Sequence, residues 1–296
     1  MGNIYAARGW YNVEARSAGL LRHREARTMR FAQIQPEQGV FEADKGKRAW
    51  IMAPLGGDNR FGLVDGDKAT VSGDRHVMVK EIKPDGKTRL FTVHGHQSGE
   101  GEIKAVNGKE SISAAVTIYP KKEYKVSFRF PSAPDLDGNM KRLTTGVPAE
   151  ATAWVKSVND IFGPQCNIWF RLISSQDITL TKTLVKPSAT NADEMFTKAD
   201  KAADVTVFLA KDIFAPEASG FFQTVVKQIV CEDRDKGPNF VRTLAHELGH
   251  FVLDKRGTPG HTGKDFGLMN DGYKYGTVIN RDLANLMNEV VAGVRE

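Results

Sequence analysis

Five consecutive residues, His246-Glu247-Leu248-Gly249-His250, carry the side chains most able to do chemistry in this chain. On a helix, His246 and His250 project from the same face, about 6 Å apart along the axis. Both imidazoles can then bind one Zn²⁺ at about 2.0–2.1 Å. Glu247 lies beside this face, where a carboxylate can accept the proton of a metal-bound water. The sequence therefore predicts a zinc site with His246 and His250 as ligands and Glu247 as general base.

The residues around the motif favour this prediction. Gly249 lies inside the expected helix, where glycine costs about 1 kcal/mol relative to alanine, so another group is expected to pack closely against it. We predict a helix that starts with Asn239 as its N-cap and runs to Asp254. Its apolar stripe lies opposite the two histidines and consists of Phe240, Leu244, Leu248, Phe251 and Val252.

A catalytic zinc needs a third protein ligand and an open fourth position. His261 is the leading candidate, because it lies on the Gly-rich segment that follows the helix. Asp254 is a rival, but in a continuing helix it lies about 12 Å from His246 along the axis, too far for a shared ion. The remaining alternatives are Asp265, Asp271 and Glu289.

These residues resemble the metzincin-type zinc metallopeptidases, and the resemblance extends from about Ala149 to Glu296. The family pattern is His-Glu-x-x-His-x-x-Gly-x-x-His, followed by a methionine turn beneath the metal. His246 and His250 match the first two ligands, and Glu247 matches the general base. The resemblance implies a zinc endopeptidase.

The chain departs from the family pattern directly after the helix. Leu253 stands where the family has its glycine, and Arg256 stands where it has its third histidine. His261 follows His250 by eleven residues instead of six, so the linking loop is five residues longer. The spacing from His261 to Met269 is family-like.

Two further residues acquire roles from the resemblance. Met269, in the segment Gly267-Leu268-Met269-Asn270, corresponds to the methionine of the turn. Some relatives place a tyrosine near the zinc to stabilise an oxyanion, which makes Tyr273 a candidate for that role. Without the zinc motif, Met269 would be interpreted as an ordinary core residue.

The elements upstream of the motif predict a twisted sheet with covering helices. A helix is expected over Ala149–Phe162, ended by Gly163-Pro164. Strands are expected at Tyr124–Phe130, Asn167–Ile173, Asp204–Ala210 and Gln223–Cys231. One of the last two is expected to be the sheet edge to which an extended substrate adds by main-chain hydrogen bonds. A final helix begins near Asn280 and packs inward through Leu283, Leu286, Met287, Val290 and Val291.

The N-terminal part has a different texture. From about Phe41 to Pro120, short β-like runs alternate with turn signals such as Asn107-Gly108, which predicts a small antiparallel, immunoglobulin-like sandwich. Residues 1–40 are expected to form an arm, with a helix from Asn12 to Ala32. The predicted fold class is α+β, with an arm over 1–40, a β-sandwich over 41–120 and a zinc metallopeptidase domain over 121–296.

Composition excludes several other classes of protein. The chain has 296 residues, 41% hydrophobic and 26% charged, which is enough for two domains with buried cores. It contains no apolar run of eighteen residues, and its first thirty residues lack a signal-peptide h-region. A net charge of +5 without any familiar binding signature gives no sign of nucleic-acid binding. The two cysteines, Cys166 and Cys231, are expected to be buried free thiols.

The sequence thus predicts an endopeptidase that uses one zinc ion and acts on protein or peptide substrates. No calcium loop is recognisable among scattered acidic residues such as Asp233 and Asp235, which leaves Ca²⁺ undecided. The N-terminal region is expected to bind a delivery or inhibitor partner, and export would follow a signal-independent route. Two alternatives stay open: a binding or adhesion module with an inactive peptidase-like half, and a zinc hydrolase of a non-peptide bond.

Overall fold

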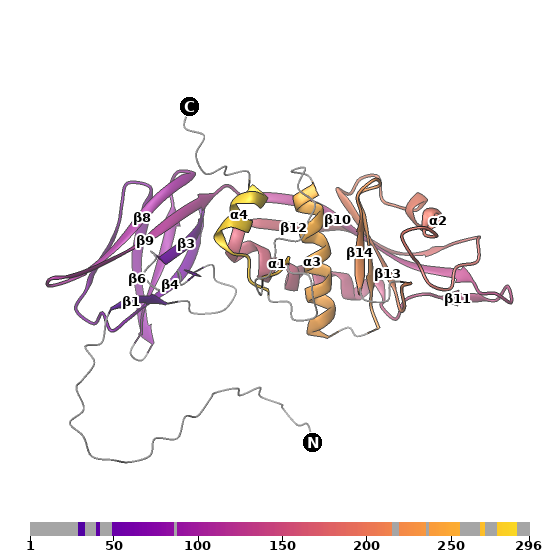
Figure 1. Cartoon of the computed structure of the whole chain (residues 1–296), viewed down its shortest axis with the longest axis horizontal. Coiled ribbons are helices and arrows are strands. Elements are labelled where there is room, and N and C mark those ends of the chain that lie inside the picture. Colours follow the sequence, from indigo (N-terminus) through magenta and orange to yellow (C-terminus); the bar gives the residue numbers. More distant parts are fainter. Residues whose placement is uncertain are drawn as a thin grey trace, which may run out of the picture.

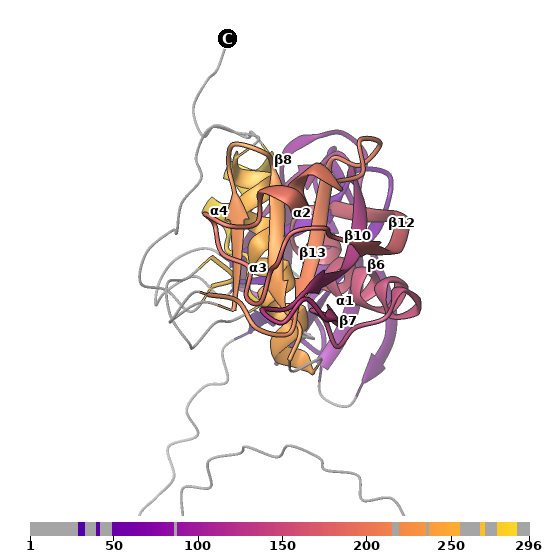
Figure 2. The same cartoon turned by 90° about the vertical axis from the view of Figure 1, so that its right-hand side faces the viewer.

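The computed structural model describes residues 29–32, 40–41, 49–85, 88–214, 219–234, 237–254, 267–269 and 277–288. Two strand-rich halves follow one another along the long axis, with the N-terminal half on the left in Figure 1. In the end-on view of Figure 2 the second half therefore stands in front of the first. The described residues form a mixed α+β structure with several sheets and few helices, which confirms the predicted class at that level.

The N-terminal half is a β-sandwich of two sheets, with strand orders β1-β4-β7-β6 and β2-β3-β9-β8-β5. The strands are Arg30–Ala32 (β1), Val40–Phe41 (β2), Ala49–Pro54 (β3), Asp58–Val64 (β4), Thr70–Gly73 (β5), Val77–Asp85 (β6), Thr88–Gly95 (β7), Gly99–Asn107 (β8) and Glu110–Tyr119 (β9). The rings of Phe61 and Phe91 stack 5.3 Å apart in one sheet and share a buried core with Ile103 and Val116 of the other. Alternating inward side chains of both sheets thus close a single core.

Two sequence predictions for this half are wrong. The sandwich is not wholly antiparallel, because β3 and β9 pair in parallel. It also starts before residue 41, since β1 pairs with β4 and buries Phe31 in the sandwich core. The end of the predicted helix Asn12–Ala32 is therefore a strand, where an alternating burial pattern outweighs helical spacing. Residues 12–28 of that helix lie outside the described residues.

The second half is built on a sheet with the order β11-β10-β13-β15-β14, in which β12 also pairs with β10. Its strands are Lys122–Pro134 (β10), Met140–Arg142 (β11), Ile168–Thr179 (β12), Val205–Ala210 (β13), Gly220–Gln223 (β14) and Gln228–Glu232 (β15). Its helices are Pro148–Glu150 (a 3₁₀ turn, η1), Ala151–Cys166 (α1), Asp193–Thr197 (α2), Pro238–Asp254 (α3) and Arg281–Asn288 (α4). β10, β12, β13 and β15 run parallel, as connections through helices and long loops require.

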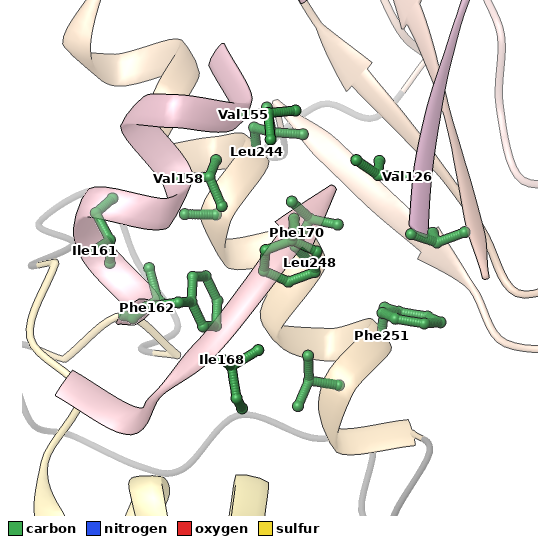
Figure 3. Packing of buried hydrophobic residues seen from close by; sticks show 14 of the residues in the cluster. Val126, Val155, Val158, Ile161, Phe162, Ile168, Phe170, Leu244, Leu248 and Phe251 are labelled. Carbon is green, nitrogen blue, oxygen red and sulfur yellow. The ribbon is translucent and has the colours of Figure 1, made fainter. Parts of the chain in front are cut away.

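Both faces of this sheet are covered, which explains why all six residues of β13 are buried. α1 and α3 pack together on one face, where Val158 and Phe162 of α1 meet Leu244 and Leu248 of α3, as Figure 3 shows. α2 contributes Met195 to a smaller core on the opposite face. The predicted apolar stripe of the motif helix is confirmed, because all of its members are buried.

Helix α1 continues past the position at which we predicted its end. Gly163 and Pro164 lie within the helix, which ends at Asn167 in the left-handed conformation (φ 53°). A Cβ at Gly163 would lie 2.6 Å from the ring of Trp169, so this glycine permits close packing of helix on strand. The extension places Gln165 and Cys166 on the helix.

Three other boundaries differ from the predictions. The run Gln223–Cys231 is two antiparallel strands, β14 and β15, joined by a tight turn in which Lys227 has a φ of 57°. Helix α3 begins at Pro238, so Asn239 is inside it and is not its N-cap; proline suits the first helical turn, whose amides lack helical partners. On α4, Leu283 and Met287 are buried as predicted, but Leu286 is 37% exposed.

The two halves share a core. Trp50, Met52 and Tyr119 of the sandwich belong to the same buried cluster as α1, α3 and α4. Asn59 donates from its side-chain amide to the carbonyls of Met52 and Pro164, at 2.9 and 3.0 Å, and so joins the sandwich to α1. The sandwich is therefore a structural neighbour of the second half along a packed interface.

Helix α4 lies at this junction and contacts both sides (Figure 1). Asn285 accepts a hydrogen bond from the hydroxyl of Tyr119, and Arg281 forms an ion pair with Glu100 of β8 at 3.0 Å. On the other side, the amide of Asn288 donates to the carbonyl of Cys166 at 2.8 Å. Helix α4 is thus bonded both to the sandwich and to α1.

Candidate metal centre

His246 and His250 project side by side from α3, one turn apart. Their rings are perpendicular, with centroids 4.7 Å apart, and their Nε2 atoms are 3.1 Å apart. Two nitrogens bound to one tetrahedral zinc at about 2.0–2.1 Å lie about 3.3 Å from each other. The pair is therefore spaced as two ligands of one ion, without rearrangement of the helix.

The hydrogen bond of His246 sets its tautomer. Its Nδ1 lies 2.7 Å from the backbone carbonyl oxygen of Leu268, which can only accept, so Nδ1 carries the proton. In the neutral ring, Nε2 then presents a lone pair. Metal-binding histidines are commonly oriented by such a contact to a carbonyl.

Glu247 follows His246 directly on α3 and is buried, with 5% of its surface exposed. Its Oε2 is buried and has no hydrogen-bond partner among the described residues. Burial raises the pKa of this carboxyl to about 8, because a charge without a partner is poorly solvated there. A buried polar atom left without a partner costs stability, so its presence calls for an explanation.

The space for Glu247 is made by Gly220, the first residue of β14. A Cβ on Gly220 would lie 2.9 Å from Cγ and 3.0 Å from Oε1 of Glu247. Gly220 is also the register partner of Cys231, whose pKa is raised well above its ordinary value by burial and by the nearby Glu247. The carboxylate thus lies against β14 and β15.

Met269 packs against the helix at the glycine that separates the two ligands. Met269 is fully buried, and a Cβ on Gly249 would lie 2.4 Å from its sulfur. The expectation that a group packs closely at Gly249 is thus confirmed, and Met269 is that group. The segment Gly267–Met269 therefore supports both the helix and the orientation of His246.

The structure does not describe the predicted third ligand. His261 and Tyr273 lie outside the described residues, as do the alternatives Asp265, Asp271 and Glu289. Within the described ranges, no third His, Cys, Asp or Glu joins the histidine pair. The carboxylate of Asp254 pairs with Lys227 instead, in agreement with the distance argument against it.

The exposed edge of the sheet near Glu247 is not one of the two strands we expected. β13 lies between β10 and β15, and β15 lies between β13 and β14. Among the described strands, the edge on the side of Glu247 is β14, which starts at Gly220, the residue next to the Glu247 side chain. We did not predict this strand from the sequence, because Gly220–Gln223 lies directly before the next apolar run and is not separated from it by a clear turn signal.

The two cysteines and the acidic residue Asp233, all named in the sequence analysis, lie in the described part of the chain. Cys166 and Cys231 are both buried free thiols, as predicted. Asp233 is fully buried and accepts hydrogen bonds from the side chain of Thr144 and from the amides of Thr145 and Gly146. Its carboxylate is thus engaged in holding a loop.

Sequence reasoning missed two contributors to the site. The carbonyl of Leu268 leaves no trace in a side-chain pattern. Gly220 does leave a signal, since a glycine in an apolar run marks a close approach of another group, but nothing in the sequence says which group approaches.

No helix in the described ranges is long and apolar enough to cross a membrane.

Comparison with known proteins adds little to this geometry. No family model and no curated protein matches the chain. Among solved structures, domains 4 and 5 of the S-layer protein SbsC are 16% identical, with 23% of this chain and 40% of that chain covered at a TM-score of 0.21. A twitchin kinase fragment of C. elegans, with kinase and immunoglobulin domains, is 11% identical over 31% of this chain and 21% of that chain (TM-score 0.20). The titin Ig tandem A164-A165 is 12% identical over 27% and 52% (TM-score 0.18). These partial matches carry no functional argument.

Proposed function

We propose that this protein is a zinc-dependent endopeptidase, in which His246 and His250 bind the metal together with His261. The observation that carries the proposal is the 3.1 Å separation of the two Nε2 atoms beside the buried, unpartnered carboxyl oxygen of Glu247. The first feature supplies a preformed pair of ligands, and the second supplies a base next to them. The metzincin resemblance of the sequence agrees with both, with Met269 as the turn methionine and Tyr273 as a candidate oxyanion stabiliser.

Zinc bound at these histidines would polarise the attacking water and the scissile carbonyl. Glu247 would accept the proton of that water and later donate it to the leaving amine. Without a metal, burial raises the pKa of Glu247 to about 8; the positive charge of a bound zinc ion would favour the ionised carboxylate, which is the form that accepts the proton. The buried setting between α3 and β14 keeps bulk water from competing for that proton.

The substrate we propose is an extended protein or peptide segment that pairs with β14. This strand has a neighbour on one side only among the described strands, and it begins at the residue that touches Glu247. A peptide added to such an edge forms main-chain hydrogen bonds irrespective of sequence. A peptide bond of the added strand would therefore lie close to the carboxylate of Glu247.

The burial of Glu247 also weighs against an inactive binding module. Burial raises the pKa of Glu247 to about 8, because the buried carboxyl loses the solvation of its charged form. Keeping a polar carboxyl at this position costs stability, and a chain without catalytic use for Glu247 would gain stability from an apolar residue there. A zinc hydrolase of a non-peptide bond remains the alternative, because His246, His250 and Glu247 could serve in the hydrolysis of either kind of bond.

The N-terminal half, which we propose to be immunoglobulin-like, would hold a partner or position the substrate. Its packed junction with the second half gives it a fixed place relative to the metal centre. We further propose that residues 1–28, upstream of the described sandwich, bind a delivery or inhibitor partner during export by a signal-independent route. Deletion of residues 1–28 with unchanged export and activity would contradict this part.

The test combines metal analysis with cleavage of a peptide library by the full chain. The wild type is expected to hold zinc and to produce new peptide amino termini, whereas Glu247→Gln holds zinc and produces none. Asp254→Asn is the matched control on the same helix, and it is expected to keep both zinc and cleavage. Zinc binding without cleavage of any peptide would overturn the peptidase proposal in favour of the alternatives.

A further inference from the structure

Gln165 is a buried amide on α1 that does not belong to the predicted site. It is fully buried, and its side chain forms hydrogen bonds to two backbone groups far along the chain. Its Nε2 donates to the carbonyl of Thr277 at 2.8 Å, and its Oε1 accepts from the amide of Ile279, also at 2.8 Å. Gln165 therefore fixes the segment 277–279 in position and direction.

This segment in turn holds the support of His246. Val278, between the two anchored residues, forms a parallel bridge with Gly267. The amide of Leu268 donates to the carbonyl of Val278 at 2.8 Å. The carbonyl of the same Leu268 accepts the proton of His246 Nδ1. A continuous series of hydrogen bonds thus runs from Gln165 to the imidazole.

The same segment also fixes the packing beneath the ligands. Met269 follows Leu268 directly and packs against Gly249, between His246 and His250. The described backbone contacts of Gly267–Met269 go to segment 277–279. A shift of that segment after loss of the anchor would therefore move the carbonyl of Leu268 and the side chain of Met269 together.

We infer that Gln165 is a positioning residue of the metal centre, which acts on zinc affinity through Leu268 and His246. This inference rests on the proposed function only as far as zinc binding, and it does not require peptide cleavage. Substitution of partners that orient metal-binding histidines commonly lowers metal affinity by about 10- to 100-fold.

Asn159 provides a matched control on the same helix. Its amide donates to the carbonyl of Phe170 at 2.9 Å, and its Oδ1 accepts from the amide of the same residue at 2.7 Å. Gln165→Ala and Asn159→Ala therefore each remove one hydrogen bond to a backbone carbonyl and one from a backbone amide outside α1. Gln165→Ala also removes the bond from Nε2 to the carbonyl of Ile161, one turn earlier on the same helix. Only the carbonyl and the amide that Gln165 binds outside α1 belong to the segment that supports His246.

The experiment measures the Zn²⁺ dissociation constant of the full chain by chelator competition, together with the absorption spectrum of the Co²⁺ form. We expect Gln165→Ala to weaken zinc binding at least tenfold and to alter the Co²⁺ spectrum, whereas Asn159→Ala leaves both as in the wild type. Equal zinc affinity in the two variants would overturn the inference. Should Gln165→Ala not fold, Gln165→Glu keeps the acceptor for Ile279 and removes the donor to Thr277, and it must show the same loss of affinity. A wild type without zinc affinity would instead refute the proposed function itself.

Discussion

Two buried carboxyl groups, those of Asp233 and Glu247, lie near the end of β15, and they differ in their hydrogen-bond partners. Asp233 has its oxygens occupied by three donors from the loop 144–146. Glu247 has one oxygen without a described partner and a pKa raised to about 8 by burial. A satisfied buried carboxylate strengthens a fold, whereas an unsatisfied one weakens it. The comparison teaches that Asp233 has a structural role, and it agrees with the proposal that Glu247 serves catalysis.

The strongest test of this contrast is to change Glu247 by one atom. Glu247→Gln keeps the size of the side chain but cannot accept the proton of a water. We expect kcat/KM to fall by about 10³-fold, within the range for general-base catalysis, while the protein stays folded. Steady-state cleavage and thermal unfolding measure the two quantities. Full activity in Glu247→Gln would contradict the proposed catalytic role of Glu247 and, with it, the contrast to Asp233.

The opposite result is expected for Asp233. Asp233→Ala leaves the amide of Thr145 and the hydroxyl of Thr144 without their acceptor in a buried place, whereas the amide of Gly146 keeps the hydroxyl oxygen of Thr144 at 3.0 Å. Each unsatisfied group costs about 1–3 kcal/mol, so we expect the free energy of unfolding to fall by at least about 2 kcal/mol. Denaturant unfolding measures this loss, and zinc content per folded molecule is expected to stay unchanged. A neutral effect on stability would contradict the structural role.

The pH dependence of stability sharpens the comparison further. In the metal-free protein, the pKa of Glu247 rises from an ordinary 4.5 to about 8 on folding. A raised pKa means that the stability contributed by the protonated form is complete below pH 4.5 and is lost as pH rises toward 8. Relative to Glu247→Gln, the wild type should therefore lose roughly 3 kcal/mol by pH 7. Unfolding curves of both proteins in chelator at several pH values test this, and parallel pH profiles would contradict it.

The smallest expected effect concerns the space around Glu247. A Cβ at Gly220 would lie 2.9 Å from Cγ of that residue, so Gly220→Ala must displace the carboxylate. We expect a fall in kcat of about tenfold, which corresponds to about 1.4 kcal/mol, with zinc content unchanged. An unaltered kcat would show that the position of the carboxylate against β14 does not matter.

Helical spacing predicted well wherever it coincided with burial. The apolar stripe from Phe240 to Val252 is sufficient to place α3 and, with it, the common direction of His246 and His250. The predicted ends of helices and strands were wrong where a residue makes a tertiary contact that its local conformational preference does not reveal. Gly163 allows close packing against Trp169, and the helix continues to Cys166.

The supporting contacts of the site were beyond sequence reasoning for a related reason. The hydrogen bond of His246 goes to a backbone carbonyl, and every residue has one. The edge strand β14 is four residues long and is separated from β15 only by a turn. The sandwich boundary failed because β1 pairs with β4 across a long stretch of chain, and local patterns carry no information on such pairing.

The central claim is that two imidazoles of one helical turn and one from the following segment hold a single zinc ion. X-ray absorption at the zinc edge of the purified full chain tests it most directly. The account predicts bound zinc with three imidazole nitrogens at about 2.0–2.1 Å, reduced by one in His261→Ala. A protein without zinc, or a zinc environment that His250→Ala leaves unchanged, would contradict it.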